Sequence, residues 1–365
     1  MNEKTRVYLD NLTATPMISE AREAVVQTLQ NQVGSRYSSN SAGRATRDFL
    51  RSREDEIIAI VSGEACRFCS GGAEANRIAV LALGRSQRSA GKDHVVSTTL
   101  EDSSTLDSLR ALAAEGSSVS LTGVAGDGRV EPAELESLIG PRTGLVSVSS
   151  ASPVSGVLNP VDEISKICRD REVLLHCDAG CVAGRVKLDL SDPPVDVVSI
   201  SSHLLGGPPG MGAVVCRGPK GCGLEAGPLP PSLPNLPGLA GMTAAMKEAS
   251  RVLSARRSTV ERLTEVVLAH LREKDVEFEL FGRKVSRVPG AFLLDLGPEV
   301  REGLHARLDV SGMVVACHDS LARKSFLRSV FGEEVNPDSF VGGCFYCTNS
   351  IVDAELFART LCDLL

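Results

Sequence analysis

The chain has 365 residues, of which 42% are hydrophobic and 23% are charged, so it is long enough to fold as two domains of ordinary size. Its formal net charge of -7 excludes a surface built mainly to bind nucleic acid or an anionic membrane. The sequence contains no uninterrupted apolar run of about 18 residues and opens without a signal-peptide pattern, so we expect a cytoplasmic protein without a membrane span.

Short apolar runs alternate with helix-like segments over most of the first 217 residues. We predict strands at residues 95–99, 119–122, 145–148, 173–176, 197–200 and 213–216. Most of these runs are apolar on both faces, which is typical of a sheet covered on both sides. We predict helices between them at residues 104–115, 132–138 and 160–171. This alternation predicts an α/β fold with a mostly parallel sheet sandwiched by helices.

A proline-rich stretch at residues 228–237 interrupts this pattern and is typical of a domain boundary. After it, apolar residues recur at helical spacing over 238–273, which predicts one long helix. The remainder predicts strands at 291–295, 313–316 and 343–348 and a last helix from Val352. We therefore expect an N-terminal segment (1–15) that joins the small domain, a large domain (16–227), and a linker, long helix and small α+β domain (228–365).

The chain contains eleven cysteines, an odd number with irregular spacing. Reduced thiols are the better interpretation for a chain of this size. The pairs Cys66/Cys69 and Cys344/Cys347 both fall in strand-like runs, where residues three apart point to opposite faces. We therefore expect no metal site.

Two strand ends carry the residues that indicate a chemistry: Asp178 within HCDA (176–179), and the segment SSHL (201–204) at the end of the next predicted strand. A carboxylate beside a pyridine nitrogen keeps that nitrogen protonated, so the ring can act as an electron sink. Here the sequence resembles the cysteine desulfurase and selenocysteine lyase family, whose pattern reads His-x-Asp-Ala and then Ser-x-His-Lys. The resemblance implies the fold type I architecture of class V aminotransferases, with pyridoxal phosphate as cofactor.

Further motifs extend the resemblance along nearly the whole chain. The segment SGGAEAN (70–76) is similar to the family's glycine-rich turn, so Gly72 and Ala73 are candidates to hold the cofactor phosphate through backbone N–H groups. The resemblance also makes Asp178, Cys181, Ser201 and His203 candidate cofactor-binding residues. Near the C-terminus, VACH (315–318) resembles the segment around the catalytic cysteine of the selenocysteine lyase branch, which makes Cys317 a candidate sulfur or selenium acceptor.

The departures from the family pattern fall on its chemistry. Leu204 stands at the position of the Schiff-base lysine, and leucine has neither an amine nor a group to titrate, so no covalent aldimine is expected. Asp102 replaces a histidine that stacks on the ring, Ala73 a threonine that reaches the phosphate, and Cys181 a glutamine at the ring oxygen. Phe345 occupies the place of the arginine that binds the substrate carboxylate.

Several residues keep two interpretations. Asp178 either meets a pyridine nitrogen or caps a turn, and His203 either contacts a phosphate or is a satisfied structural histidine. Cys317 is either a reactive thiol or a spectator. Arg323 and Lys324 either lower the pKa of a nearby thiolate or belong to a solvated helix face.

Three functions are compatible with these observations. The first is a catalytically impaired or inactive relative that binds a partner, as a homodimer or as a heterodimer with an active paralogue. The second is a working pyridoxal-phosphate-dependent C–S or C–Se lyase that delivers sulfur or selenium through Cys317. The third is a thiol-based carrier of sulfur or metal. The resemblance and the lost lysine together favour the first.

Overall fold

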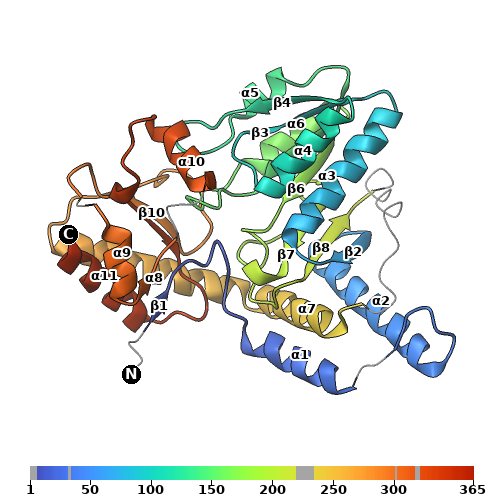
Figure 1. Ribbon diagram of the computed structural model, residues 1–365, viewed down its shortest axis with the longest axis horizontal. Helices are drawn as coiled ribbons and strands as arrows, with labels where there is room; N and C mark the ends of the chain where they lie inside the picture. Colours follow the sequence, from blue (N-terminus) through green and yellow to red (C-terminus); the bar gives the residue numbers. More distant parts are fainter. Residues whose placement is uncertain (1–5, 32–33, 219–233, 301, 317–320) are drawn as a thin grey trace.

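The structure, a computed structural model, describes residues 6–31, 34–218, 234–300, 302–316 and 321–365. Its largest element is a seven-stranded sheet with the order β2-β8-β7-β6-β5-β3-β4 (Figure 1). Strands from β7 to β4 pair in parallel, whereas β8 runs antiparallel to β2 and β7. The predicted mostly parallel α/β sheet is therefore confirmed. The strands are β2 (Ala65–Cys69), β3 (His94–Thr98), β4 (Ser118–Thr122), β5 (Thr143–Ser149), β6 (Leu174–Asp178), β7 (Val197–Ser201) and β8 (Gly212–Cys216).

Helices cover both faces of this sheet. Successive strand residues point to opposite faces, and both sets are apolar. Val95 and Val197 pack with α3 and α4 on one face, whereas Val96 and Val198 belong to the core shared with α2, α6 and α7 on the other (Figure 1). Burial on both faces explains the continuous valine-rich runs. The helices of this part are α1 (Ser19–Asn31), α2 (Ser41–Val61), α3 (Gly72–Ser89), α4 (Ser103–Ala114), α5 (Pro132–Ser137), α6 (Val161–Asp170) and α7 (Leu236–Arg251).

The prediction of a single helix over 238–273 is wrong. The structure has two helices, α7 and α8 (Leu253–Glu273), which meet at Val252. The backbone of Val252 has φ -110° and ψ 15°, outside helical values. The break lets α7 pack against α1 and α2, while α8 packs against α11 (Ile351–Leu364).

A second hydrophobic core lies among the C-terminal elements. Its antiparallel sheet has the order β12-β10-β9, and β1 (Val7–Tyr8) pairs in parallel with β11 (Met313–Val314). The predicted strand 343–348 is shifted: β12 ends at Cys344, and Cys347 lies exposed in the turn that follows. The remaining elements are β9 (Glu279–Leu280), β10 (Ala291–Asp295), β12 (Phe340–Cys344), α9 (Leu304–Val310) and α10 (Leu321–Phe331).

The described residues show no disulfide, no cluster of metal-ligand side chains and no membrane-spanning helix. None of the nine cysteines in these residues forms a disulfide, and no group of three or more His, Cys, Asp or Glu side chains there is placed to hold a metal ion. Within the same residues, no helix has the length and apolar character needed to cross a membrane.

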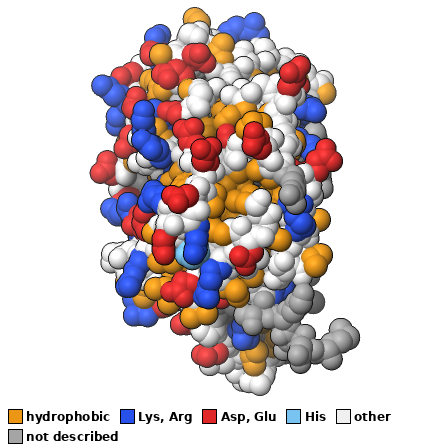
Figure 2. Space-filling view, turned by 90° about the vertical axis from the view of Figure 1, so that its left-hand side faces the viewer, with side chains coloured by type: hydrophobic (Ala, Val, Ile, Leu, Met, Phe, Trp, Pro, Cys, Tyr) orange, Lys and Arg blue, Asp and Glu red, His pale blue; other side chains and the backbone are white. Residues whose placement is uncertain are grey.

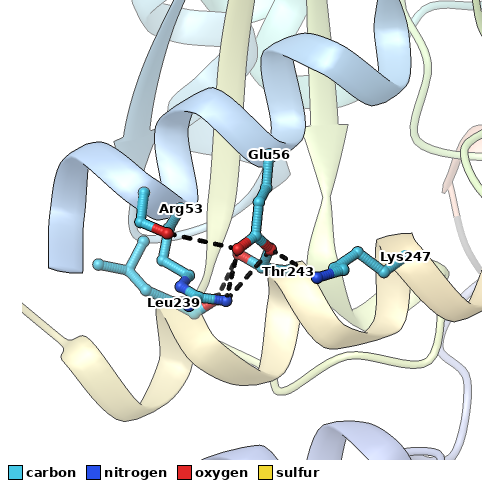
Figure 3. Close-up of polar contacts among 6 residues, drawn as sticks. Arg53, Glu56, Leu239, Thr243 and Lys247 are labelled. Atoms are coloured by element: carbon cyan, nitrogen blue, oxygen red, sulfur yellow. Dashed lines mark hydrogen bonds and ion pairs between the residues drawn. The ribbon is translucent and has the colours of Figure 1, made fainter.

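Glu56 connects α2 to α7 at the surface (Figure 3). Its carboxylate accepts Lys247 Nζ from α7 at 3.3 Å and Arg53 Nη1 from its own helix at 3.0 Å. Partly exposed pairs of this kind contribute at most about 1 kcal/mol, so the apolar core between α2 and α7 carries most of their association.

The side of the molecule formed by α9 and α11 has a mixed surface. Figure 2 shows hydrophobic side chains gathered near the centre of this face, with acidic and basic side chains interspersed around them. Val310 on α9 and Val352 on α11 are 74% and 61% exposed. This face thus combines exposed apolar side chains with charges of both signs.

Candidate functional site

A cavity of about 350 Å³ lies where the carboxyl ends of β5, β6 and β7 approach the N-terminus of α3. The carboxyl edge of a parallel sheet is the usual ligand-binding edge of such folds, because strand-to-helix turns converge there. The cavity brings together seven of the eight residues predicted to take part in catalysis or cofactor binding. They are Gly72, Ala73, Asp178, Cys181, Ser201, His203 and Leu204. Cys317, the eighth, lies outside the described residues.

Asp178, the last residue of β6, has a carboxylate fixed by two donors. Asn76 Nδ2 on α3 donates to Oδ2 at 2.7 Å, and the Gly180 backbone N–H donates to Oδ1 at 2.8 Å. Burial raises the pKa of Asp178, and the two hydrogen bonds act against that rise. The carboxylate is thus oriented on the cavity wall, where it could accept a hydrogen bond from a protonated ring nitrogen.

The turn that leads into α3 depends on a close approach to β7. A Cβ placed on Gly72 would lie 2.8 Å from both Cβ and Oγ of Ser201, which is too near for a side chain. The Ser70 N–H and hydroxyl each donate to Glu74 at 2.6 Å, which lowers the pKa of that carboxyl. Gly72 and Ala73, the first residues of α3, thus line the cavity where a helix N-terminus favours an anion, while the Glu74 carboxylate is held by Ser70.

Ser201 and His203 contact each other at the end of β7. Ser201 Oγ lies 2.9 Å from His203 Nδ1, and the His203 carbonyl accepts both the N–H and the hydroxyl of Thr15. Burial lowers the pKa of His203, which favours the neutral imidazole. The two hydrogen bonds from Thr15 tie the loop after β7 to the N-terminal segment.

Leu204 ends the short 3-10 helix Ser202–Leu204 and lines the same cavity as Asp178. A Cβ on Gly180 would be 3.1 Å from Leu204 Cδ1 and 3.0 Å from Asp178 Oδ1. The position that the resemblance gives to an amine is therefore an apolar part of the cavity wall, next to the carboxylate that would face a ring nitrogen.

Two neighbouring carboxylates follow β3. Asp102 is exposed, lines the cavity and caps α4, because it accepts the Ser104 N–H at 2.8 Å. Glu101 is buried and accepts the hydroxyls of Thr98 and Ser149, each at 2.7 Å. Burial raises the pKa of Glu101 to about 7. Asp102 is thus occupied as a helix cap, and Glu101 titrates near neutrality inside the protein.

Two sequence-based candidates have properties that limit their roles. Burial raises the pKa of Cys181 to about 12, so its thiol stays protonated at neutral pH. The resemblance places Phe345 at a substrate-binding position, but Phe345 is fully buried in the C-terminal core. Its ring centroid lies 5.9 Å from that of Phe292. The expected place of Phe345 at the cavity is therefore wrong. Phe345 packs in the C-terminal core and does not line the cavity.

Sequence reasoning gave no cavity role to Asn76, and it linked Arg323 only to the pKa of a nearby thiolate. Asn76 follows Gly72 by four residues on one helix, a spacing that places both on the same face and could have marked it. Arg323 on α10 lines the cavity with its side chain 2% exposed, so a solvated helix face is the wrong interpretation for this residue. Its direction depends on tertiary packing and has no local signal.

Comparison with known proteins agrees with this architecture. A family model described as "Aminotransferase class-V" matches residues 7–221. Human cysteine desulfurase is 31% identical over 342 residues, which cover 90% of this chain and 74% of that protein. A solved NifS-like protein has a TM-score of 0.86 at 21% identity, covering 98% of this chain and 99% of the other. A NifS-like protein from Rickettsia africae has a TM-score of 0.83 at 20% identity, covering 99% of both chains.

The mostly parallel sheet, with a cavity at its carboxyl edge and a glycine turn entering α3, defines the fold of type I pyridoxal-phosphate proteins. The chain belongs to the class V aminotransferase family, and within it the cysteine desulfurases are its homologues. Pyridoxal phosphate is the cofactor expected for this family.

Proposed function

We propose that this chain is a cysteine desulfurase-like protein that does not perform the family's lysine-dependent cleavage and acts in the cytosol by binding a protein partner. The observation that carries the proposal is the apolar side chain of Leu204 beside the Asp178 carboxylate. A Schiff base requires an amine at this point, and the leucine side chain cannot replace it.

The cavity suits pyridoxal phosphate only in part. The Asp178 carboxylate on the cavity wall supports a contact with a ring nitrogen, and Gly72 and Ala73 in the first turn of α3 support a contact with a phosphate. Leu204 offers no amine, and the Asp102 carboxylate stands where the resemblance expects a stacking ring. These residues support non-covalent retention of the cofactor at most, and no reaction step through the cofactor follows from them.

Partner binding is the function that we propose for an intact scaffold with this site. The resemblance implies a dimer with its sites near the subunit interface, either of two copies of this chain or of this chain with an active paralogue. Sedimentation equilibrium of the purified chain, alone and mixed with a paralogue, measures both assemblies. A monomer in every mixture contradicts the partner part of the proposal.

An absorbance spectrum tests the chemical part. Purified protein with added pyridoxal phosphate is treated with borohydride, desalted and analysed by intact mass. We expect the cofactor to leave on desalting and the mass to stay that of the chain. A visible band abolished by borohydride together with a mass gain would show a covalent lysine adduct and overturn the proposal.

A second function, an active lyase that uses Cys317 as sulfur or selenium acceptor, is supported by the homology with cysteine desulfurases. Its test is release of alanine from cysteine or selenocysteine by the wild-type chain. Activity that disappears in Cys317→Ala and persists in the Cys362→Ala control would favour it over the first proposal. A thiol carrier is the third function, and metal analysis of protein purified without chelator tests its metal-binding form.

A further inference from the structure

Arg323 is a buried cation on the wall of the cavity. It extends from α10, its side chain is 2% exposed, and it is among the largest fully buried side chains of the described residues. Of the residues that line the cavity in the described part of the chain, it is the sole arginine or lysine. A buried guanidinium is costly unless its donors meet oxygen atoms or negative charge.

The guanidinium of Arg323 packs against β12, in space that is open because residue 342 is a glycine. Arg323 Nη2 donates to the Phe340 carbonyl at 3.2 Å, and Nη1 lies 3.5 Å from the Ala316 carbonyl. A Cβ on Gly342 would be 2.9 Å from Nη1 and 3.2 Å from Nη2. Because any larger residue would overlap the guanidinium, Gly342 is what admits Arg323 to this place.

The electrostatic surroundings are mixed. Burial raises the pKa of Asp10, and the positive charge of Arg323 acts against that rise, so the two groups lie within electrostatic reach. The cavity wall also carries the carboxylates of Asp178 and Asp102, which would repel a multiply charged anion. A single negative group placed at Arg323 meets the only arginine or lysine that the described residues contribute to the wall.

The rest of the wall restricts the ligand further. Leu12, Val154 and Leu204 are apolar, and they share the cavity of about 350 Å³ with Arg323. A small ligand with one carboxylate and a short aliphatic part matches this combination. The planar guanidinium can receive a carboxylate through two parallel hydrogen bonds.

We propose that Arg323, admitted by Gly342, is the anion-binding residue of this cavity and that its ligand is a small aliphatic carboxylate. The carboxylate site is supplied by α10 and is independent of position 345. The inference goes beyond the proposed loss of catalysis, because it concerns binding by the chain without any cofactor.

Ligand-observed NMR titration of the cofactor-free chain tests the proposal with propionate, propionamide and L-alanine as probes. We expect propionate to bind at least about tenfold more tightly than propionamide, since the amide lacks the charge. A gain for L-alanine over propionate would show that the wall carboxylates also hold an ammonium group. Equal affinity for propionate and propionamide, or no binding of either, would overturn the proposal.

Variants separate a binding role from a structural one. Arg323→Gln is expected to lose about tenfold in propionate affinity and the preference over propionamide, while Arg323→Lys retains part of both. Gly342→Ala should weaken propionate binding with the arginine still present. Arg328→Gln, an exposed position on the same helix, is the matched control.

Unchanged propionate selectivity in folded Arg323→Gln would refute the proposal. If that variant does not fold, the Gly342→Ala titration and the wild-type comparison of propionate with propionamide still decide it.

Discussion

Asn76 on α3 and Asp178 at the end of β6 are joined by a hydrogen bond of 2.7 Å, which couples the helix that opens the cavity to its central carboxylate. Asn76→Ala would remove a donor from a carboxylate that is already penalised by burial. We expect the free energy of unfolding to fall by about 1.5–3 kcal/mol, more at neutral than at acidic pH, because only the charged form needs the donor. Urea denaturation measures this, and Asn31→Ala on the exposed end of α1 is the control. Equal losses in the two variants would contradict it.

The contact between Gly72 and Ser201 gives a second prediction. Gly72→Ala should lower the free energy of unfolding by about 1–3 kcal/mol, because the new Cβ would overlap the Ser201 side chain. Gly126→Ala, which has no heavy atom within 4 Å of its Cβ position, should not. Combining Gly72→Ala with Ser201→Gly should recover much of the loss in a double-mutant cycle. Strict additivity of the two changes would show that the close approach is not what requires glycine.

Glu101 gives a pH-dependent prediction. Its pKa rises from 4.5 to about 7 in the folded chain, so the folded state binds the proton more tightly. Its contribution to stability is therefore fully present below the unfolded pKa and is lost as the pH rises from about 4.5 to 7. Glu101→Gln removes this loss, and relative to wild type it should gain up to about 3 kcal/mol between pH 4.5 and 8. Unfolding free energies at several pH values measure the difference, and parallel curves would contradict the raised pKa.

The Leu204→Lys variant separates the missing amine from the rest of the site. The new amine would lie beside Asp178, so we expect a borohydride-sensitive absorbance band with pyridoxal phosphate, which the Leu204→Met control should not show. We expect no release of alanine from cysteine above background. Asp102 and Ala73 remain at the places of the stacking ring and of the phosphate-binding threonine, so the lysine alone does not rebuild the site. Clear turnover by this single variant would show that the other departures matter little.

The large sheet was accessible from the sequence because its signal is local. Val197 and Val198 point to opposite cores, and such doubly apolar runs are visible without any contact information. Asp178 was found for the same reason: strand ends of a parallel sheet share one edge, so the end of a valine-rich run locates a cavity residue.

The features that could not be predicted depend on distant parts of the chain. Apolar spacing continues through Val252, but the helix breaks there because α7 and α8 pack on different partners. The direction of Arg323 is set by the missing side chain at Gly342, and Phe345 is drawn into the core by Phe292. Neither arrangement leaves a pattern in neighbouring residues.

The pairing of β1 with β11 has a consequence for how the chain is made. Val7 lies opposite Met313, so β1 leaves the ribosome long before its partner strand has been made. Contacts this distant in sequence form slowly and late. A ribosome-bound chain that stops before residue 313 should therefore leave residues 6–10 open to protease, whereas release of the full chain should protect them.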